Sequence, residues 1–353
     1  MIGRNLSPQR MFADLAAQHV PGCAFTARDT ATADAWREAT LPKVLATLGR
    51  LPERVDPLPE LIAEWEVGPV RRQKWWIDVG PHISATLLVN RPADAPPGKR
   101  LPVIACWFGH GHFGKDTAMS SGTGRDDLAA AVAESNGNYG YQLAAQGYLT
   151  FAIDWMGQGE RNDSSKPQSL STNRSRDWCN LIYLNATLLG MTPLGMNLVH
   201  GMTATDVVLG FDDADPGRLG VMGISGGGTM SLWHTLVDAR VRATEIICYS
   251  DLFAAFGFRD LNYCGMQITP GLYQLVDLPD LQGLIAPRPL LVDIGAEDDC
   301  FVIDTAIQCH RRVRHIYDTF GASEHLELDL HPGQHAWGGN KGPAFFERWL
   351  ASG

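Results

Sequence analysis

A serine between glycines, at the junction of a predicted strand and a predicted helix, constrains this chain more than any other feature. Residues 223–227 read Gly-Ile-Ser-Gly-Gly, which fits the pattern G-x-S-x-G. Residues 218–222 form a short apolar run typical of a buried strand, and residues 228–234 begin a helical pattern. So tight a turn requires glycine beside the serine, and the helix start that follows stabilises developing negative charge. We therefore predict that Ser225 is a catalytic nucleophile.

The partners that such a serine requires follow later in the chain. A serine nucleophile needs a base to take its proton and a buried carboxylate to orient that base. Asp298 comes directly after a predicted buried strand at residues 289–295, and His335 follows a strand-like alternation at residues 325–330. We predict Asp298 as the acid and His335 as the base, in the chain order Ser, acid, His. Asp299 and His331 are the respective alternatives.

A glycine-rich loop at residues 107–116 follows the first buried strand of the central region. With a serine turn of this type, that loop supplies one backbone N–H to the oxyanion, and the residue after the serine, Gly226, supplies the other. The histidines of the loop have no Cys, Asp or Glu at a matching spacing, so we predict no metal site and no cofactor. We expect aromatic and histidine side chains to line the substrate pocket, namely Trp107, Phe108, His112, Trp155 and Trp337.

From residue 101 the pattern alternates strands with helices, which predicts an α/β fold with a mostly parallel, doubly wound sheet. The strands are predicted at residues 103–108, 148–154, 219–223, 245–249, 290–294 and 326–330, after a hairpin at 70–79 and 83–89. The helices are predicted at residues 139–146, 180–209, 227–236, 304–320 and 343–350. Residues 35–50 should be helical with a break near Pro42. We therefore expect a helical N-terminal extension, residues 1–68, packed on a catalytic domain, residues 69–353.

Composition narrows the classes of partner and compartment. The net charge of −10 disfavours nucleic acid and anionic membranes as partners, so we expect a small-molecule substrate. The seven cysteines show no C-x-x-C spacing, which is typical of a reduced protein. The first 18 residues lack the apolar core of a signal peptide, and no apolar run approaches the ~18 residues that span a bilayer. We expect a cytoplasmic protein, and a homo-oligomer stays open.

Taken together, these motifs resemble the acetyl xylan esterase-like and dienelactone hydrolase-like branch of the α/β-hydrolase superfamily. The resemblance covers roughly residues 35–350 and includes the segments 109–116, 154–161, 220–229 and 284–289 and both later loops. It implies the α/β-hydrolase fold, with Ser225 as nucleophile, Asp298 as acid and His335 as base. It also implies that the backbone N–H of His110 joins that of Gly226 in the oxyanion hole.

The chain departs from the family pattern in the oxyanion loop. Phe108 stands where the relatives usually carry histidine, and one extra residue precedes Gly114. This departure leaves His112 as an alternative oxyanion donor.

The leading functional hypothesis is a serine hydrolase that cleaves a small or medium carboxylic ester through an acyl-enzyme. A carbon–carbon bond or lactone hydrolase would use the same triad, and the aromatic residues near the site suit a planar substrate. A non-catalytic binding protein is the third alternative, which the presence of all three triad residues disfavours. We expect loops, not a large lid, to wall the pocket: residues 154–163, residues 250–279 with their aromatic side chains, and Trp337. Such a pocket should prefer short acyl esters.

Overall fold

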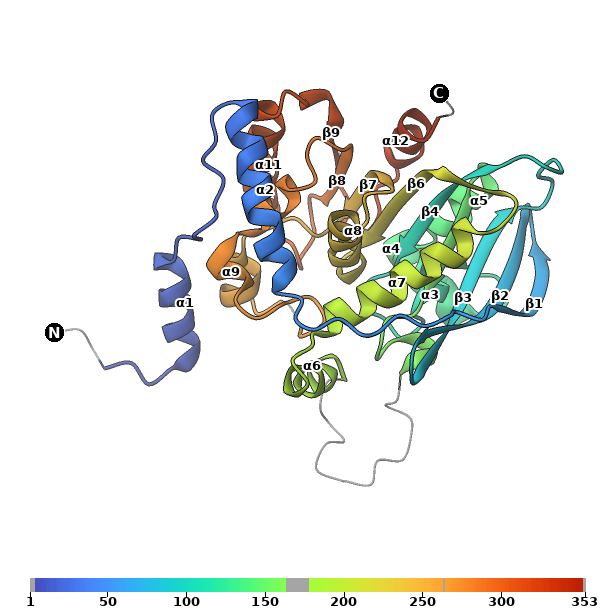
Figure 1. Cartoon of the computed structure of the whole chain (residues 1–353), viewed down its shortest axis with the longest axis horizontal. Helices are drawn as coiled ribbons and strands as arrows, with labels where there is room; N and C mark the ends of the chain where they lie inside the picture. The colour runs from blue at the N-terminus through green and yellow to red at the C-terminus, as the bar shows by residue number, and fades with distance from the viewer. Residues whose placement is uncertain (1–3, 163–177, 263, 352–353) are drawn as a thin grey trace, which may run out of the picture.

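The structure, a computed structural model, describes residues 4–162, 178–262 and 264–351. These residues form a nine-stranded sheet in the order β1-β2-β3-β5-β4-β6-β7-β8-β9 (Figure 1). The strands are β1 (Glu60–Val67), β2 (Val70–Gly80), β3 (Ile83–Pro92), β4 (Leu101–Trp107), β5 (Leu149–Ile153), β6 (Ala214–Ile224), β7 (Val241–Ile247), β8 (Leu290–Gly295) and β9 (Leu326–His331). The pairings from β1 to β5 are antiparallel, and those from β5 through β4 to β9 are parallel. The predicted α/β fold with a mostly parallel sheet is confirmed.

Helices cover both faces of this sheet, with α7 and α8 in front and α3, α4 and α5 behind in Figure 1. The helices are α1 (Pro8–Gln18), α2 (Thr30–Ala46), α3 (Lys115–Met119), α4 (Asp126–Ser135), α5 (Tyr139–Ala145), α6 (Trp178–Leu188), α7 (Pro193–Leu209), α8 (Gly226–Val237), α9 (Leu272–Leu275), α10 (Leu278–Gly283), α11 (Ile303–Thr319) and α12 (Gly342–Trp349). Short helical turns lie at η1 (Gly159–Arg161), η3 (Phe253–Arg259) and η4 (Ser323–His325). Because both faces are covered, β5 and β8 are buried along their whole length, which explains why their sequences are mostly apolar.

Three local predictions need correction. The predicted break near Pro42 is absent, because α2 runs through this proline. Pro42 has no N–H to donate to the carbonyl of Glu38, but Glu38 is exposed, so a water molecule can donate to that carbonyl instead. The predicted helix 180–209 is two helices, because Thr192 caps the start of α7 by accepting from the N–H of Gly195. Residues 60–67, placed in the helical extension, form the edge strand β1.

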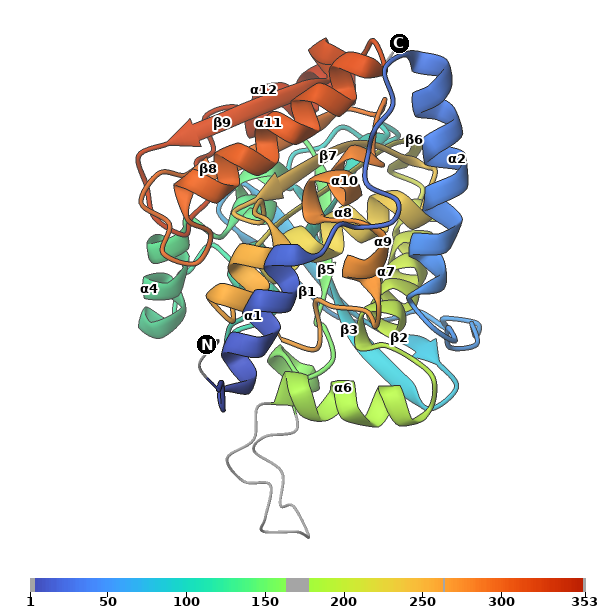
Figure 2. The same ribbon diagram turned by 90° about the vertical axis from the view of Figure 1, so that its left-hand side faces the viewer.

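The N-terminal helices α1 and α2 lie against the C-terminal half of the chain (Figures 1 and 2). The connection between them is held by backbone hydrogen bonds from Gly22 to Gln274 and from Cys23 to Leu275, of 2.8 and 2.7 Å. The Arg37 guanidinium donates to the carbonyl of Leu284. These hydrogen bonds join the N-terminal part of the chain to the segment between β7 and β8.

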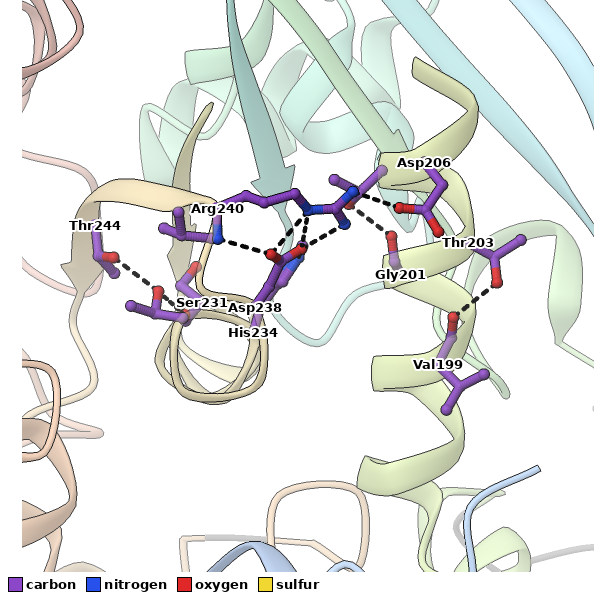
Figure 3. A network of polar contacts seen from close by, with 12 residues as sticks. Val199, Gly201, Thr203, Asp206, Ser231, His234, Asp238, Arg240 and Thr244 are labelled. Atoms are coloured by element: carbon purple, nitrogen blue, oxygen red, sulfur yellow. Dashed lines mark hydrogen bonds and ion pairs between the residues drawn. The ribbon is translucent and has the colours of Figure 1, made fainter. Parts of the chain in front are cut away.

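A polar network ties α8, the helix that follows Ser225, to α7 (Figure 3). Arg240, just after α8, forms ion pairs of 2.7 Å with both Asp206 of α7 and Asp238. Within α8 the Ser231 hydroxyl donates to the carbonyl of Gly227. The ion pairs of Arg240 hold the C-terminal end of α8, whereas the Ser231 hydrogen bond lies in its N-terminal half.

In the described part of the chain, none of the helices has the length and apolar character that crossing a membrane requires.

Candidate active site

Ser225 sits on a strained turn between β6 and α8. Its backbone angles are φ 58° and ψ −120°, a left-handed conformation that is uncommon for any residue but glycine. Its N–H donates to the carbonyl of Ile247 over 2.9 Å, so the next strand holds the turn. A Cβ at Gly223 or Gly227 would overlap the carbonyl of Trp107, which explains why both positions are glycine.

Asp298 and His335 are brought together by the loops after β8 and β9. The Nδ1 atom of His335 lies 2.9 Å from Oδ2 of Asp298. The Asp298 side chain is 1% exposed and that of His335 26%, so the carboxylate is enclosed while the imidazole reaches the surface of a cavity. The other carboxylate oxygen accepts the backbone N–H groups of Cys300 and Phe301, over 2.7 and 3.0 Å. Three donors therefore hold this carboxylate in one orientation.

The same contacts set the charge of Asp298. Burial by itself would raise the pKa of this carboxyl, but the hydrogen bond and charge of His335, together with the two backbone donors, outweigh burial and lower the pKa below its usual value. The group is thus an anion that can stabilise a positively charged imidazole.

The two alternative residues lie elsewhere. Asp299 is exposed to solvent. His331 is buried, with Nε2 3.1 Å from Oδ1 of Asp293 and Nδ1 accepting the N–H of Gly333. Its pKa is raised, first by the hydrogen bond to Asp293. Asp293 also accepts the N–H of Gly338, so this pair braces both ends of the loop that contains His335.

Ser225 and His335 line one small cavity of about 90 Å³, together with Phe108, His110 and Tyr139. A second, narrower cavity of about 20 Å³ lies on the side of Gly226. Its lining residues are Phe108, Gly109, His110, Trp155, Gln158, Asn197, Gly226, Met230, Met266 and Gln267. The space beside the serine is therefore small on both sides.

The glycine-rich loop after β4 comes close to the serine turn. A Cβ at Gly109 would lie 3.1 Å from Cβ of Ser225, and a Cβ at Gly226 would lie 3.9 Å from the backbone nitrogen of His110. His112 is exposed, and its ring contacts Phe113 edge-on. Of the two histidines considered for the oxyanion hole, His110 has its backbone beside Gly226.

The five predicted pocket residues divide into three groups. Phe108 and Trp155 line the two cavities, whereas the exposed His112 lines neither of them. Trp107 and Trp337 are packed in the interior instead, Trp107 against Trp155 and Trp337 with its indole N–H donating to Glu245 over 2.7 Å. An aromatic residue next to a functional loop has no local signature that separates a pocket wall from the core, and here the pleat turns Trp107 inward.

The long segment after β7 contributes differently from the prediction. Met266 and Gln267 supply its wall of the narrow cavity, and the sequence offered no signal for either. Its aromatic residues Phe253, Phe258 and Tyr273 line a separate apolar cavity of about 390 Å³ beneath α1. Phe256 lies in the core, and Tyr263 lies outside the described residues.

The fold also gives His110 partners that spacing along the sequence did not indicate. Nε2 of His110 lies 3.1 Å from Sγ of Cys264, and Sγ of Cys179 completes a group whose ligand atoms lie within 4.8 Å of one another. Histidine and cysteine side chains in such a group are able to hold a metal ion.

Comparison with known proteins supports the fold. No protein-family profile matches the chain. YtaP of Bacillus subtilis (strain 168), a protein named as a hydrolase, is 24% identical over 225 residues, which cover 63% of this chain and 70% of YtaP.

Solved structures are similar over most of the chain. A protein of Bacteroides fragilis NCTC 9343 named as an acetyl xylan esterase superposes with a TM-score of 0.73 at 18% identity, covering 94% of this chain and 83% of that one. A glucuronoyl esterase from Solibacter usitatus gives a TM-score of 0.63 at 17% identity, covering 89% and 93%. A glucuronoyl esterase from Teredinibacter turnerae T7901 gives 0.60 at 17% identity, covering 90% and 84%. The sheet order, the strained serine turn and these neighbours together identify the α/β-hydrolase fold in this chain.

Proposed function

We propose that this protein is a serine hydrolase that cleaves a short-chain carboxylic ester. The observation that supports this most directly is the 2.9 Å hydrogen bond between His335 and the buried Asp298, next to a cavity that Ser225 shares. A strained serine, a histidine oriented by an enclosed carboxylate, and a helix start behind the serine are the parts that acyl transfer needs. The esterase names of the structural neighbours agree with this activity.

In the proposed reaction, Oγ of Ser225 attacks the ester carbonyl carbon and gives its proton to His335. Because Nδ1 of His335 is bonded to Asp298, Nε2 is the nitrogen that receives this proton. The backbone N–H groups of Gly226 and His110 donate to the carbonyl oxygen as it becomes an oxyanion.

The second half of the reaction restores the enzyme. The protonated His335 passes its proton to the leaving alkoxide, and the C–O bond to the alcohol breaks, which leaves an acyl group on Ser225. Water then attacks this acyl-enzyme with His335 as base, the acid leaves, and the serine regains its proton. No metal or cofactor takes part in this sequence.

The size of the site supports a short acyl group. A volume of about 20 Å³ beside Gly226 exceeds the roughly 10–15 Å³ that one water-sized group requires, but only by a small margin. We infer that this cavity accepts the methyl of an acetyl group, and that longer chains are excluded by the buried side chains of Met230 and Met266. None of the seven cysteines, all of which lie in the described part of the chain, forms a disulfide, which supports a reducing compartment such as the cytoplasm.

The test measures kcat/KM for p-nitrophenyl acetate, butyrate and octanoate, with mass spectrometry of the protein after fluorophosphonate treatment. We expect acetate to be the best substrate and the phosphonate to be attached to Ser225. The matched control is Ser231→Ala, because Ser231 is a serine of α8 whose hydroxyl is already bonded to Gly227. Labelling that persists in Ser225→Ala, or the highest kcat/KM on octanoate, would contradict the proposal.

A further inference from the structure

A cluster of one imidazole and two thiols lies beside the proposed active site, and none of these three side chains takes part in the proposed reaction. It consists of His110 from the loop after β4, Cys179 from α6, and Cys264 from the segment after η3. The Nε2 atom of His110 is 3.1 Å from Sγ of Cys264, and all three ligand atoms lie within 4.8 Å of one another. The other edge of the His110 ring faces the serine turn, since a Cβ at Gly226 would lie 3.2 Å from Nδ1.

The spacing of these atoms suits a tetrahedral zinc ion. Zn–S bonds of about 2.3 Å and Zn–N bonds of about 2.0–2.1 Å at tetrahedral angles separate the ligand atoms by roughly 3.6–3.8 Å. Atoms already within 4.8 Å of one another reach that arrangement through side-chain rotation of a few tenths of an ångström to about 1 Å. Three other groups of potential ligands are present among the described residues, but each contains one thiol and at least one carboxylate, and two of them use Asp298. The donor set with two sulfurs and one imidazole nitrogen is the one that soft d¹⁰ ions prefer.

The surroundings hold these ligands in place before any ion binds. The N–H of Gly265, next to Cys264, donates to Oδ1 of Asn180, next to Cys179, over 3.0 Å. The Gln158 side chain connects α6 to the loop after β4, because its amide nitrogen lies 3.4 Å from Sγ of Cys179 and its oxygen accepts the N–H of Gly111. Such outer hydrogen bonds to ligands and their loops are typical of built metal sites.

The immediate shell is apolar and open on one side. Met156, Met266 and the buried Cys179 form a small hydrophobic cluster, with Cys264 and Met196 packed against it. His110 is exposed, so the fourth coordination position would face solvent and hold a water molecule.

We propose that His110, Cys179 and Cys264 form a zinc site of the Cys₂His type, which clamps together three segments around the active-site cavities. When zinc binds, each thiol releases one proton to solvent and becomes a thiolate ligand. The ion holds the loop after β4, α6 and the segment after η3 in one arrangement. Ester hydrolysis itself proceeds through Ser225 and needs no metal, so this inference is independent of the proposed function.

The experiment uses the full chain, purified with a phosphine reductant and stripped of metal by chelation. Cobalt(II) is then titrated in and followed by absorption, because a tetrahedral thiolate site gives thiolate-to-cobalt charge-transfer bands and intense visible bands. We expect one cobalt per chain, displaced by one equivalent of zinc. With zinc at a hundredfold excess over its Kd, the unfolding temperature should rise by about 4 °C for a chain of this length.

Two variants and a matched control locate the site. In Cys264→Ser and in Cys179→Ala the charge-transfer bands should weaken and the Kd for cobalt should rise by about a hundredfold or more, since even outer contacts are worth 10–100-fold. Cys23→Ser is the control, because Cys23 is half-buried, like Cys264, and outside any disulfide, but lies in the N-terminal segment. Circular dichroism checks that each variant is folded.

The proposal is overturned if the reduced wild-type chain gives no charge-transfer band, or if both variants bind cobalt as the control does. Formation of a Cys179–Cys264 disulfide that persists in the reductant and prevents binding would overturn it as well. Hydrolysis of p-nitrophenyl acetate by the chelated enzyme is recorded in parallel. Absence of cobalt binding with hydrolysis intact would refute only the zinc site. Cobalt binding without hydrolysis would refute only the esterase.

Discussion

Replacing Asp298 by Asn tests how the site orients its base. The Asn oxygen can still accept the N–H groups of Cys300 and Phe301, so the loop should keep its shape. The Asn amide nitrogen, however, takes the place of the oxygen that now lies 2.9 Å from Nδ1 of His335. Two N–H donors cannot face each other, so Nδ1 must become the acceptor and the proton moves to Nε2.

In that tautomer His335 has no lone pair on Nε2 with which to take the proton of Ser225, and the imidazolium loses its anionic partner. In a serine hydrolase with the same triad chemistry, this change lowers kcat by about 10⁴, which corresponds to about 5.4 kcal/mol of transition-state stabilisation. We expect a loss of that order in Asp298→Asn, with an unfolding midpoint close to that of the wild type.

The assay is kcat for p-nitrophenyl acetate at neutral pH, with Asp299→Asn as the matched control. Asp299 is the next residue in the same loop but is exposed, so its amide should keep kcat within about threefold of the wild type. A loss below about tenfold in Asp298→Asn, or equal losses in the two variants, would refute the assignment of the orienting carboxylate.

Four further outcomes are expected. Ser225→Ala should lower kcat at least about a hundredfold with an unchanged circular dichroism spectrum, and a smaller loss would remove Ser225 as nucleophile. Gly227→Ala should lower the free energy of unfolding by about 3 kcal/mol or more in urea titrations, because the new Cβ meets the Trp107 carbonyl. Gly111→Ala is the control and should change this free energy by less than about 0.5 kcal/mol, because a Cβ at Gly111 has no neighbouring atom within 4 Å. Burial by itself would raise the pKa of Glu160, but the charge of Lys115 and three side-chain donors lower this pKa from 4.5 to about 2. The ionised Glu160 therefore stabilises the fold fully above about pH 4.5, and this contribution is lost as the pH falls towards 2. Urea midpoints should therefore fall less steeply with acid in Glu160→Gln. Exhaustive chelation should leave kcat for p-nitrophenyl acetate unchanged, and recovery of a dead preparation by zinc alone would contradict the serine mechanism.

Structural features that depend on residues adjacent in the sequence were predictable from the sequence. The strands β4, β5, β6 and β8 each contain a mostly apolar run, and the serine turn is set by glycines whose absent side chains leave room for the Trp107 carbonyl. Since the carboxyl ends of parallel strands meet at one edge of a sheet, the chain order alone predicted that the loops bearing Ser225, Asp298 and His335 converge. The sequence favoured Asp298 as the acid but left Asp299 as an alternative, because adjacent residues share the same local pattern.

Side-chain direction and long-range contacts were decided only by the tertiary structure. Packing turned Asp298 towards His335 and left Asp299 in solvent, and it directed His331 to Asp293. The same packing buried Trp107 and Trp337, which local sequence does not distinguish from pocket walls. It also brought Cys179 and Cys264 to His110 from distant segments, and no spacing of these residues along the sequence indicates this. Local preferences determine where a strand or turn forms, whereas the partners of a side chain depend on how whole elements pack, and that information is spread over the entire chain.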